Sequence, residues 1–231
     1  LVPIVGKSVE VKDIDISNVK TQGGDLVAKE LDEAMCKAVA PIALETIRLS
    51  GDRQCIAFFP GCRSAEYGMH RINREKPGSC CYVDAKTETY ERKSTVRAFR
   101  NSQYQYFANV LVASEGFDAP ATSVIAQARP TKSRALYAQQ IGRGTRVLPS
   151  VVEHLHGPEN APARRAAIAS SLKPNMLVLD FVGNSGRHTL QTVEDVLGGK
   201  YTEEEVKRAK KKRESGQDAL SALKEAGVID G

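Results

Sequence analysis

Tryptophan is missing from the chain, and aromatic residues make up only 6% of its 231 residues. Long apolar runs are missing too, because even the stretch Met176–Val182 is interrupted by Asp180. A helix that crosses a bilayer needs about 20 mostly apolar residues. No stretch of this sequence is therefore expected to span a membrane, and we predict no membrane partner. Its 41% hydrophobic and 26% charged residues are typical of a globular protein.

Cysteine and histidine are too few and too poorly spaced to predict a metal centre. The five cysteines include no C-x-x-C pair, and the four histidines offer only the isolated H-x-H of His154 and His156. Zinc sites and disulfide frameworks need more regular spacing. We therefore expect no metal ligands, and we expect buried free thiols in a reducing cytoplasm. The cysteines are Cys36, Cys55, Cys62, Cys80 and Cys81.

A strong excess of charge of one sign is absent as well. The chain has 33 Lys and Arg against 28 Asp and Glu, a net charge of +5, which permits a polyanionic partner without requiring one. Only the tail 201–231 is strongly patterned, with three glutamates followed by "KRAKKKRE". Acidic residues before basic ones suit a helix dipole. We expect a charged helical tail, with a nucleic-acid-binding tail as the alternative.

The first residues predict a strand and a helix that pack on a larger domain. "VEVKDIDI", within residues 1–25, alternates apolar and polar residues as a strand does, and Gly23–Gly24 marks its exit. Apolar residues then recur at helical spacing over 26–49, where Pro41 is expected to kink or divide the helix. The chain begins with Leu and no signal peptide opens it, so the simplest expectation is a fragment of a longer protein. We treat 1–50 as this lead-in segment.

Short apolar runs then alternate with helical segments over residues 51–200. This rhythm predicts an α/β fold, a parallel sheet covered by helices on both faces. A Pro- and Ala-rich insert at about 149–173 reads as a loop with one short helix. The expected strands are 55–59, 79–84, 109–114, 123–128 and 175–182, and the expected helices are 63–74, 88–99 and one that carries residues 137–146.

Three segments rich in glycine, arginine and small polar residues lie between these elements. They are "PGCRS" (60–64), "EGFDAP" (115–120) and the stretch 129–146. Because ligands of open parallel sheets bind outside the carboxyl ends of the strands, we expect the three segments to gather at one edge. Carboxylates accept hydrogen bonds from ribose hydroxyls, and arginine forks donate to phosphates. The composition therefore favours recognition of phosphates and sugars.

The same segments resemble motifs of superfamily 2 helicases. "QQIGRGTR" (139–146) is similar to their motif VI, Q-x-x-G-R-x-x-R. "ASEGFDAPATSVI" (113–125) resembles motif V, and "CIAFFPGCRSAEY" (55–67) resembles motif IV. A lone G-R-x-x-R would be a weak signal, whereas this order and spacing are specific. The resemblance is greatest to the DEAD/DEAH-like branch that contains RadD-type proteins and type III restriction subunits.

The resemblance implies a RecA-like sheet that forms helicase lobe 2, with a helical C-terminal extension. The motif VI arginines of such lobes reach ATP across a cleft, which implies that Arg143 and Arg146 are arginine fingers. The other residues implied on the ATP side are Gln139, Gly142, Asp118 and Gly116. The residues implied at the nucleic-acid backbone are Gly61, Arg63, Ser114 and Gly116, so Gly116 is implied at both places.

Each assignment has a structural alternative. Arg143 and Arg146 can form salt bridges within the fold, and Asp118 can cap a turn. Arg63 can be a solvated residue at the start of a helix. Gln139 can be a polar packing residue.

Two motifs of a complete ATPase are absent, namely G-x-x-x-x-G-K-[ST] and an acidic D-E-x-D/H box. These motifs bind the triphosphate and Mg²⁺, so ATP and Mg²⁺ are expected to be held mainly by an N-terminal RecA-like lobe. The resemblance thus implies the second lobe of an ATP-dependent helicase or translocase, inactive alone, acting on DNA or, with less support, RNA. The alternative is a stand-alone RecA-like nucleic-acid- or partner-binding module without ATPase activity.

Overall fold

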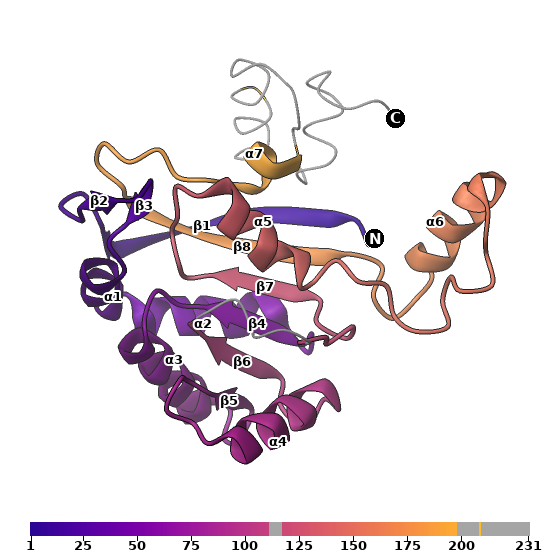
Figure 1. The fold of residues 1–231 in the computed structure, drawn as a ribbon, viewed down its shortest axis with the longest axis horizontal. Helices are drawn as coiled ribbons and strands as arrows, with labels where there is room; N and C mark the ends of the chain where they lie inside the picture. Colours follow the sequence, from indigo (N-terminus) through magenta and orange to yellow (C-terminus); the bar gives the residue numbers. More distant parts are fainter. Residues whose placement is uncertain (111–116, 198–207, 209–231) are drawn as a thin grey trace.

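A single parallel sheet organises the chain in the computed structural model, which describes residues 1–110, 117–197 and 208. The strand order is β1-β8-β7-β4-β6-β5, and every pairing in this sheet is parallel (Figure 1). The predicted α/β fold is therefore confirmed. The strands are β1 Ile4–Asp15, β4 Cys55–Phe58, β5 Cys80–Tyr82, β6 Tyr106–Asn109, β7 Val124–Gln127 and β8 Met176–Asn184.

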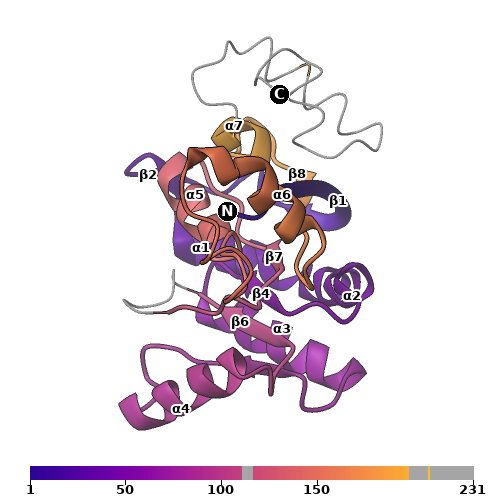
Figure 2. The same cartoon turned by 90° about the vertical axis from the view of Figure 1, so that its right-hand side faces the viewer.

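Helices cover both faces of the sheet, as predicted. Successive side chains of a strand point to opposite faces; in β4, Cys55 and Ala57 join one apolar cluster, and Ile56 and Phe58 join the other. The first face carries α1 Ala28–Cys36, α2 Val39–Ser50 and α3 Cys62–Glu75. The second carries α4 Thr89–Arg100, α5 Arg134–Gly142 and α7 Val193–Leu197. Figure 2 shows α4 and α5 on one side of the strands and α2 and α3 on the other.

The N-terminal segment is part of the sheet. β1 pairs with β8 along most of its length, beginning with Ile4 beside Met176. Gly23 and Gly24, both with positive φ, form the turn between the short strands β2 (Thr21–Gln22) and β3 (Asp25–Leu26). The expected division of the next helix is also present, because α1 ends at Cys36 and α2 begins at Val39.

Pro41 lies in the first turn of α2. A proline is tolerated there because the first N–H groups of a helix have no partner within it. The division of the helix therefore precedes the proline.

One expected strand is misplaced. The sequence predicts a strand over 109–114, but β6 is Tyr106–Asn109, so the prediction begins where the strand ends. Both stretches are apolar, and a strand buried on both faces has no alternation that would fix its bounds. Residues 111–116 lie outside the described residues.

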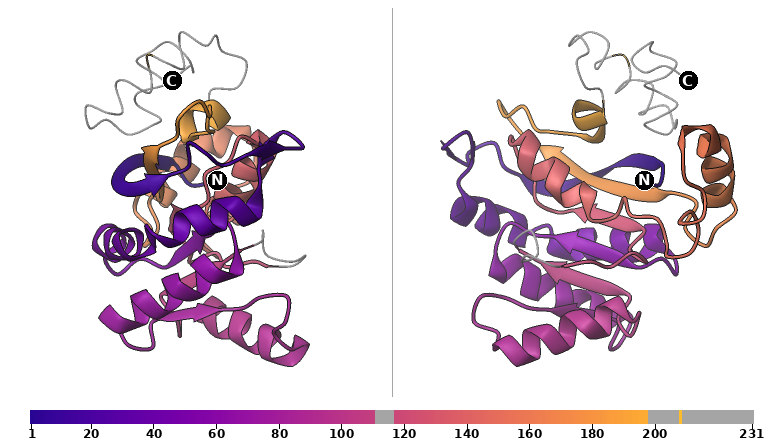
Figure 3. Two further views of the ribbon diagram at one scale, coloured as in Figure 1. Left: turned by 90° about the vertical axis from the view of Figure 1, so that its left-hand side faces the viewer. Right: turned by 45° about the vertical axis from the view of Figure 1, so that its right-hand side comes forward.

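The insert contains the one short α-helix that was predicted and, before it, a 3₁₀ helix that was not. They are the 3₁₀ helix η1 (Pro158–Asn160) and α6 (Ala161–Ala169). Figures 1 and 3 show α6 standing away from the sheet, on the side where β7 and β8 begin. The expected helical tail 201–231 lies outside the described residues, apart from Arg208.

The cysteines match the expectation in part. In the structure all five are free thiols; Cys55, Cys80 and Cys81 are buried, Cys36 is half-buried and Cys62 is exposed. The prediction of buried thiols is therefore wrong for Cys62. Among the described residues, no helix has the length and apolar character that crossing a membrane requires.

Candidate functional site

The motif VI-like arginines lie where the parallel strands begin, an edge that we name the amino edge. α5 starts after the carboxyl end of β7, runs back along the sheet and ends at Gly142 (Figure 1). Beyond it, Gly144 lies against Met176, the first residue of β8. The expectation that all three polar segments share the carboxyl edge is therefore wrong. The edge rule applies to loops that directly follow strands, whereas a helix of nine residues separates these arginines from β7.

Asp118 belongs to the same amino edge. It precedes β7, which begins at Val124, and its backbone carbonyl accepts a hydrogen bond from Nε of Arg100, the last residue of α4. Gly61 and Arg63, by contrast, follow the carboxyl end of β4. The structure thus brings Asp118, Gly142 and both arginines together and separates them from Gly61 and Arg63 by the length of the strands.

Two hydrogen bonds join motif V to motif VI. Arg143 Nη1 donates to the carbonyl oxygen of Phe117 at 3.0 Å, and Arg146 Nη1 pairs with Asp118 Oδ2 at 2.5 Å. The side chains of Arg146 and Asp118 are 60% and 30% exposed, so their ion pair lies at the surface. The arrangement presents two guanidinium groups and one carboxylate side by side. Such a set can bind an anion and a hydroxyl at neighbouring positions.

Aromatic packing fixes Phe117, the residue before Asp118 in the motif V segment. The ring of Phe117 stacks on Phe107 with centroids 5.4 Å apart and on Phe99 with centroids 6.2 Å apart. All three rings are buried in the cluster that α4 and β6 share. The carbonyl that accepts from Arg143 is therefore held by the core, and the arginine is directed by a rigid support.

The two glycines of "GRG" have different surroundings. A Cβ on Gly144 would overlap the side chain of Met176, so the close approach of this loop to β8 requires glycine. A Cβ on Gly142 would meet nothing within 4 Å among the described residues, and its φ lies outside the left-handed region. Gly142 is exposed. The fold therefore gives no reason for glycine at 142.

The adjacent glutamines also differ. Gln139 is exposed on α5, whereas Gln140 is fully buried and its amide atoms have no hydrogen-bond partner in the structure. Of the two, Gln139 can reach a ligand or a partner outside the chain. Tyr137, one turn earlier, is buried and donates to Asp180 Oδ1 at 2.6 Å, which ties α5 to β8.

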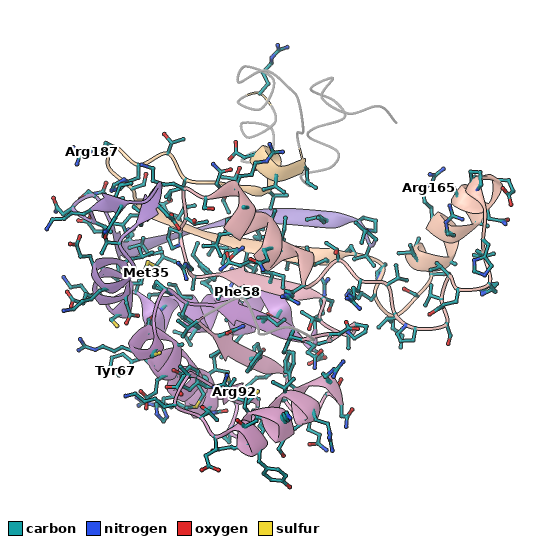
Figure 4. All side chains as sticks on the ribbon, viewed as in Figure 1. Met35, Phe58, Tyr67, Arg92, Arg165 and Arg187 are labelled. Atoms are coloured by element: carbon teal, nitrogen blue, oxygen red, sulfur yellow. The ribbon has the colours of Figure 1, made fainter. Side chains whose placement is uncertain are left out.

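At the carboxyl edge, Gly61 lies where α1 meets α3. It is the N-cap residue of α3, and the backbone N–H of Ser64 donates to Asp32 Oδ1 at 3.1 Å. A Cβ on Gly61 would overlap the Asp32 carboxylate, so packing within the chain accounts for this glycine. Arg63 is exposed, with its guanidinium 5.7 Å from the ring centroid of Tyr67, which projects outward in Figure 4. Ser114 and Gly116 lie outside the described residues.

ATP and Mg²⁺ require different ligands, and the described residues fit only one of the two. No three carboxylate, histidine or cysteine side chains in this part of the chain gather as a metal site, so these residues do not fit a Mg²⁺ site of their own. For the nucleotide the fit is better. Asp118 Oδ1 is buried and has no hydrogen-bond partner in the structure, and it lies beside Arg146 and the arginine-bearing loop.

Sequence reasoning missed Lys173, which lies behind the arginines. Its side chain is 2% exposed, and its Nζ donates to the carbonyl oxygens of Pro120 at 2.7 Å and Arg146 at 2.8 Å. Burial lowers the pKa of this ammonium to about 8. No periodic pattern marks a single lysine before a strand, so the sequence offered no signal for it.

The sheet order and the covering helices define a RecA-like α/β lobe. Two examples among solved structures have the same fold. Their sequence identity to this chain is low, so the likeness concerns the fold alone. One is a fragment from Vibrio vulnificus described as the HsdR subunit of a type I restriction enzyme, with a TM-score of 0.53, 16% identity and coverage of 82% of this chain and 33% of that chain. The other is Dbp5 of S. cerevisiae, with a TM-score of 0.51, 12% identity and coverage of 79% and 36%.

Residues 36–147 match the family of the helicase conserved C-terminal domain. This match confirms the predicted resemblance of this part of the chain to the C-terminal lobe of superfamily 2 helicases. Relatives include a 51.5 kDa protein of a Lactococcus phage, 31% identical over 134 residues, and the "Putative ATP-dependent helicase IRC3" of Saccharomyces cerevisiae, 28% identical over 146 residues. The matches cover 58% and 62% of this chain but only 29% and 21% of those proteins.

Proposed function

We propose that the chain is the C-terminal lobe of an ATP-dependent nucleic-acid helicase or translocase. Its amino edge completes an ATP site whose other half belongs to an N-terminal RecA-like lobe. The observation that carries this proposal is the joining of Arg143, Arg146 and Asp118 beside Gly142, a glycine that the fold itself does not require. The phosphates of ATP are the anion that such a pair of arginines suits.

Arg146 acts as an arginine finger in this proposal. Its ion pair with Asp118 is exposed, and exposed ion pairs contribute only about 0–1 kcal/mol. A phosphate can therefore replace the carboxylate at little cost. Arg143 is held at the carbonyl of Phe117, and its planar fork stabilises the charge that develops during phosphoryl transfer. Hydrolysis then depends on closure of the two lobes.

The remaining ATP-side residues take complementary roles. Asp118 accepts a hydrogen bond from a ribose hydroxyl through its carboxylate, and exposed Gln139 contacts the phosphates or the facing lobe. Gly142 lets the nucleotide or that lobe approach the backbone. Gly116, outside the described residues, belongs to the same set by its place in the motif. The first lobe supplies the principal ligands of ATP and Mg²⁺, so we expect this chain alone to hydrolyse no ATP.

The carboxyl edge contacts nucleic acid in this proposal. Gly61 and Arg63 lie there, and Ser114 is assigned to it by its motif. Contacts of this kind, through backbone amides, small polar groups and an arginine, hold a phosphate backbone without reading bases. DNA is the preferred partner because the resembling branch includes restriction subunits. A cytoplasmic location and the choice of DNA over RNA stay predictions.

The first experiment substitutes Arg143 in the complete protein that carries this lobe. Arg143→Ala should lower nucleic-acid-stimulated ATP hydrolysis on the order of 10³-fold, because the arginine acts in the transition state. Binding of nucleic acid should remain, since Arg143 lies at the opposite edge. Arg143→Lys should restore little activity, because lysine lacks the planar fork. Steady-state ATPase assays and a fluorescence binding assay measure both quantities.

Arg165→Ala is the matched control, because Arg165 is exposed on α6, a helix that stands away from the sheet (Figures 1 and 4). It should leave turnover unchanged. If Arg143→Ala hydrolyses ATP as fast as the wild type, the finger assignment is wrong. If the complete protein binds nucleic acid but hydrolyses no ATP, the stand-alone binding module replaces the motor.

A further inference from the structure

Lys173 joins the two loops that carry the ATP-side residues. Its Nζ contacts the carbonyl oxygen of Arg146 itself and that of Pro120, two residues after Asp118. Arg146 and Asp118 are in turn paired through their side chains. The lysine therefore holds from behind the two backbone segments whose side chains form the exposed ion pair.

The position of Lys173 is costly for a cation. A buried ammonium loses its hydration, and two neutral carbonyls replace water only in part. The nearby charges offset each other, because Arg53 disfavours the charged form and Asp118 favours it. Arg53 is held by its own acceptors, the carbonyl oxygens of Ser123 at 2.6 Å and Asn175 at 2.8 Å. An apolar side chain of similar length would avoid the desolvation but lose the two hydrogen bonds, so the two effects on stability oppose each other and the net contribution of the lysine is small.

The lysine also gives the insert 149–173 a role. The chain leaves motif VI after Arg146, forms η1 and α6 away from the sheet, and returns to the amino edge at Lys173 just before β8. The neighbouring Leu172 is 99% exposed, whereas Lys173 is 2% exposed. The returning segment thus directs this one side chain inward, against the segments that carry motifs V and VI.

We propose that Lys173 is a positioning residue that fixes Asp118 and Arg146 relative to each other for ATP hydrolysis. The inference rests on the proposed function of the amino edge. Lys173 touches neither ATP nor the reacting atoms; it holds the carbonyl group of Arg146 and that of Pro120, two residues after Asp118. Misplacement of a catalytic group by about 1 Å can lower the rate on the order of 10²-fold. Loss of the two hydrogen bonds from Lys173 can therefore lower the rate of ATP hydrolysis measurably.

The test compares Lys173→Met with the wild type in the complete protein. Methionine keeps the length and removes both hydrogen bonds. We expect kcat to fall by about 10- to 100-fold, while the melting temperature stays close to that of the wild type. A second measurement follows hydrogen exchange at the amides of Thr122 and Gly144, which donate to Ala119 and Ile141 within the two loops, at 3.0 Å each. Both amides should exchange faster in the variant.

Lys76→Met is the matched control. Lys76 Nζ donates to Gln105 Oε1 at 3.0 Å, ahead of β5 and β6, and does not touch the arginine-bearing loop. This variant should keep kcat and the exchange rates of Thr122 and Gly144.

Arg143→Ala, measured alongside, separates the two possible failures. If Arg143→Ala is inactive while Lys173→Met keeps its kcat, the positioning role is wrong and the proposed function stands. If kcat falls in Lys173→Met but exchange at both amides is unchanged, the positioning role is again wrong. Full turnover by Arg143→Ala overturns the finger assignment and, with it, a role for Lys173 in positioning these residues for hydrolysis.

Discussion

Gly142 and Gly144 differ in the demands that the fold places on them. Glycine at both positions of the motif can leave the surface beside the arginines open. The structure supports this reason only for Gly142, because Gly144 is needed for the contact with Met176. A sequence pattern shows that a side chain is absent but not which neighbour requires its absence. The identity of the arginines could be predicted from the motif; the buried Lys173 could not, because its partners are backbone carbonyls from distant segments.

The glycine pair gives a prediction at this scale. Gly144→Ala should lower the free energy of unfolding by about 1–3 kcal/mol, because the buried Met176 side chain must shift. Gly142→Ala should raise it by up to about 1 kcal/mol, since alanine is the better helix former at the last residue of α5. Under the proposed function, Gly142→Ala should nevertheless slow ATP hydrolysis in the complete protein.

Urea denaturation of this chain and ATPase assays of the complete protein measure these effects. Equal changes in stability for the two alanine variants would contradict the distinction between them.

Among the elements, α5 decides where the site lies. A sheet edge can be predicted only for a loop that follows a strand directly, and α5 carries Arg143 and Arg146 away from the end of β7 to the opposite edge. Helices α1 to α6 could be predicted in this order, whereas α7 could not, because its five residues are too few to show helical spacing. The bounds of β6 could not, because the apolar stretch that contains it continues past Asn109.

The contact between α1 and α3 provides a prediction at the element scale. Asp32 on α1 caps the first turn of α3 through the Ser64 amide. Asp32→Ala should lower the free energy of unfolding by about 1 kcal/mol, because a helix N–H loses its acceptor. Glu33→Ala is the control, since Glu33 is the exposed neighbour, and it should change stability by less than about 0.5 kcal/mol. Thermal or urea unfolding distinguishes the two, and equal effects would rule out the cap.

In the whole molecule, the N-terminal strand and the motif-bearing region share one core. β1 pairs with β8, and Val9, Val11 and Ile14 belong to the same apolar cluster as residues of α1, α2 and β4. The sequence indicated a strand here but not its neighbour, because the partner β8 follows more than 150 residues later. The lead-in segment is thus part of the folding unit.

A substitution in β1 tests this unity. Ile14 is 1% exposed, so Ile14→Ala should lower the free energy of unfolding of the entire chain by about 2–5 kcal/mol. Lys12→Ala, on the exposed side of the same strand, should have little effect. Denaturation followed by circular dichroism should show one transition that moves to lower urea. An unchanged main transition in Ile14→Ala would mean that β1 is an appendage.

The placement of the two candidate sites at opposite ends of the same strands has a mechanical consequence. β4 and β7 have four residues each, and a strand rises about 3.3 Å per residue, so the central sheet is a stiff beam about 13 Å long. A movement at the amino edge can therefore displace the carboxyl edge without any direct contact between the two edges. If the amino edge is held against a facing lobe, a rotation of this lobe about that contact displaces the carboxyl edge, which carries Arg63, sideways.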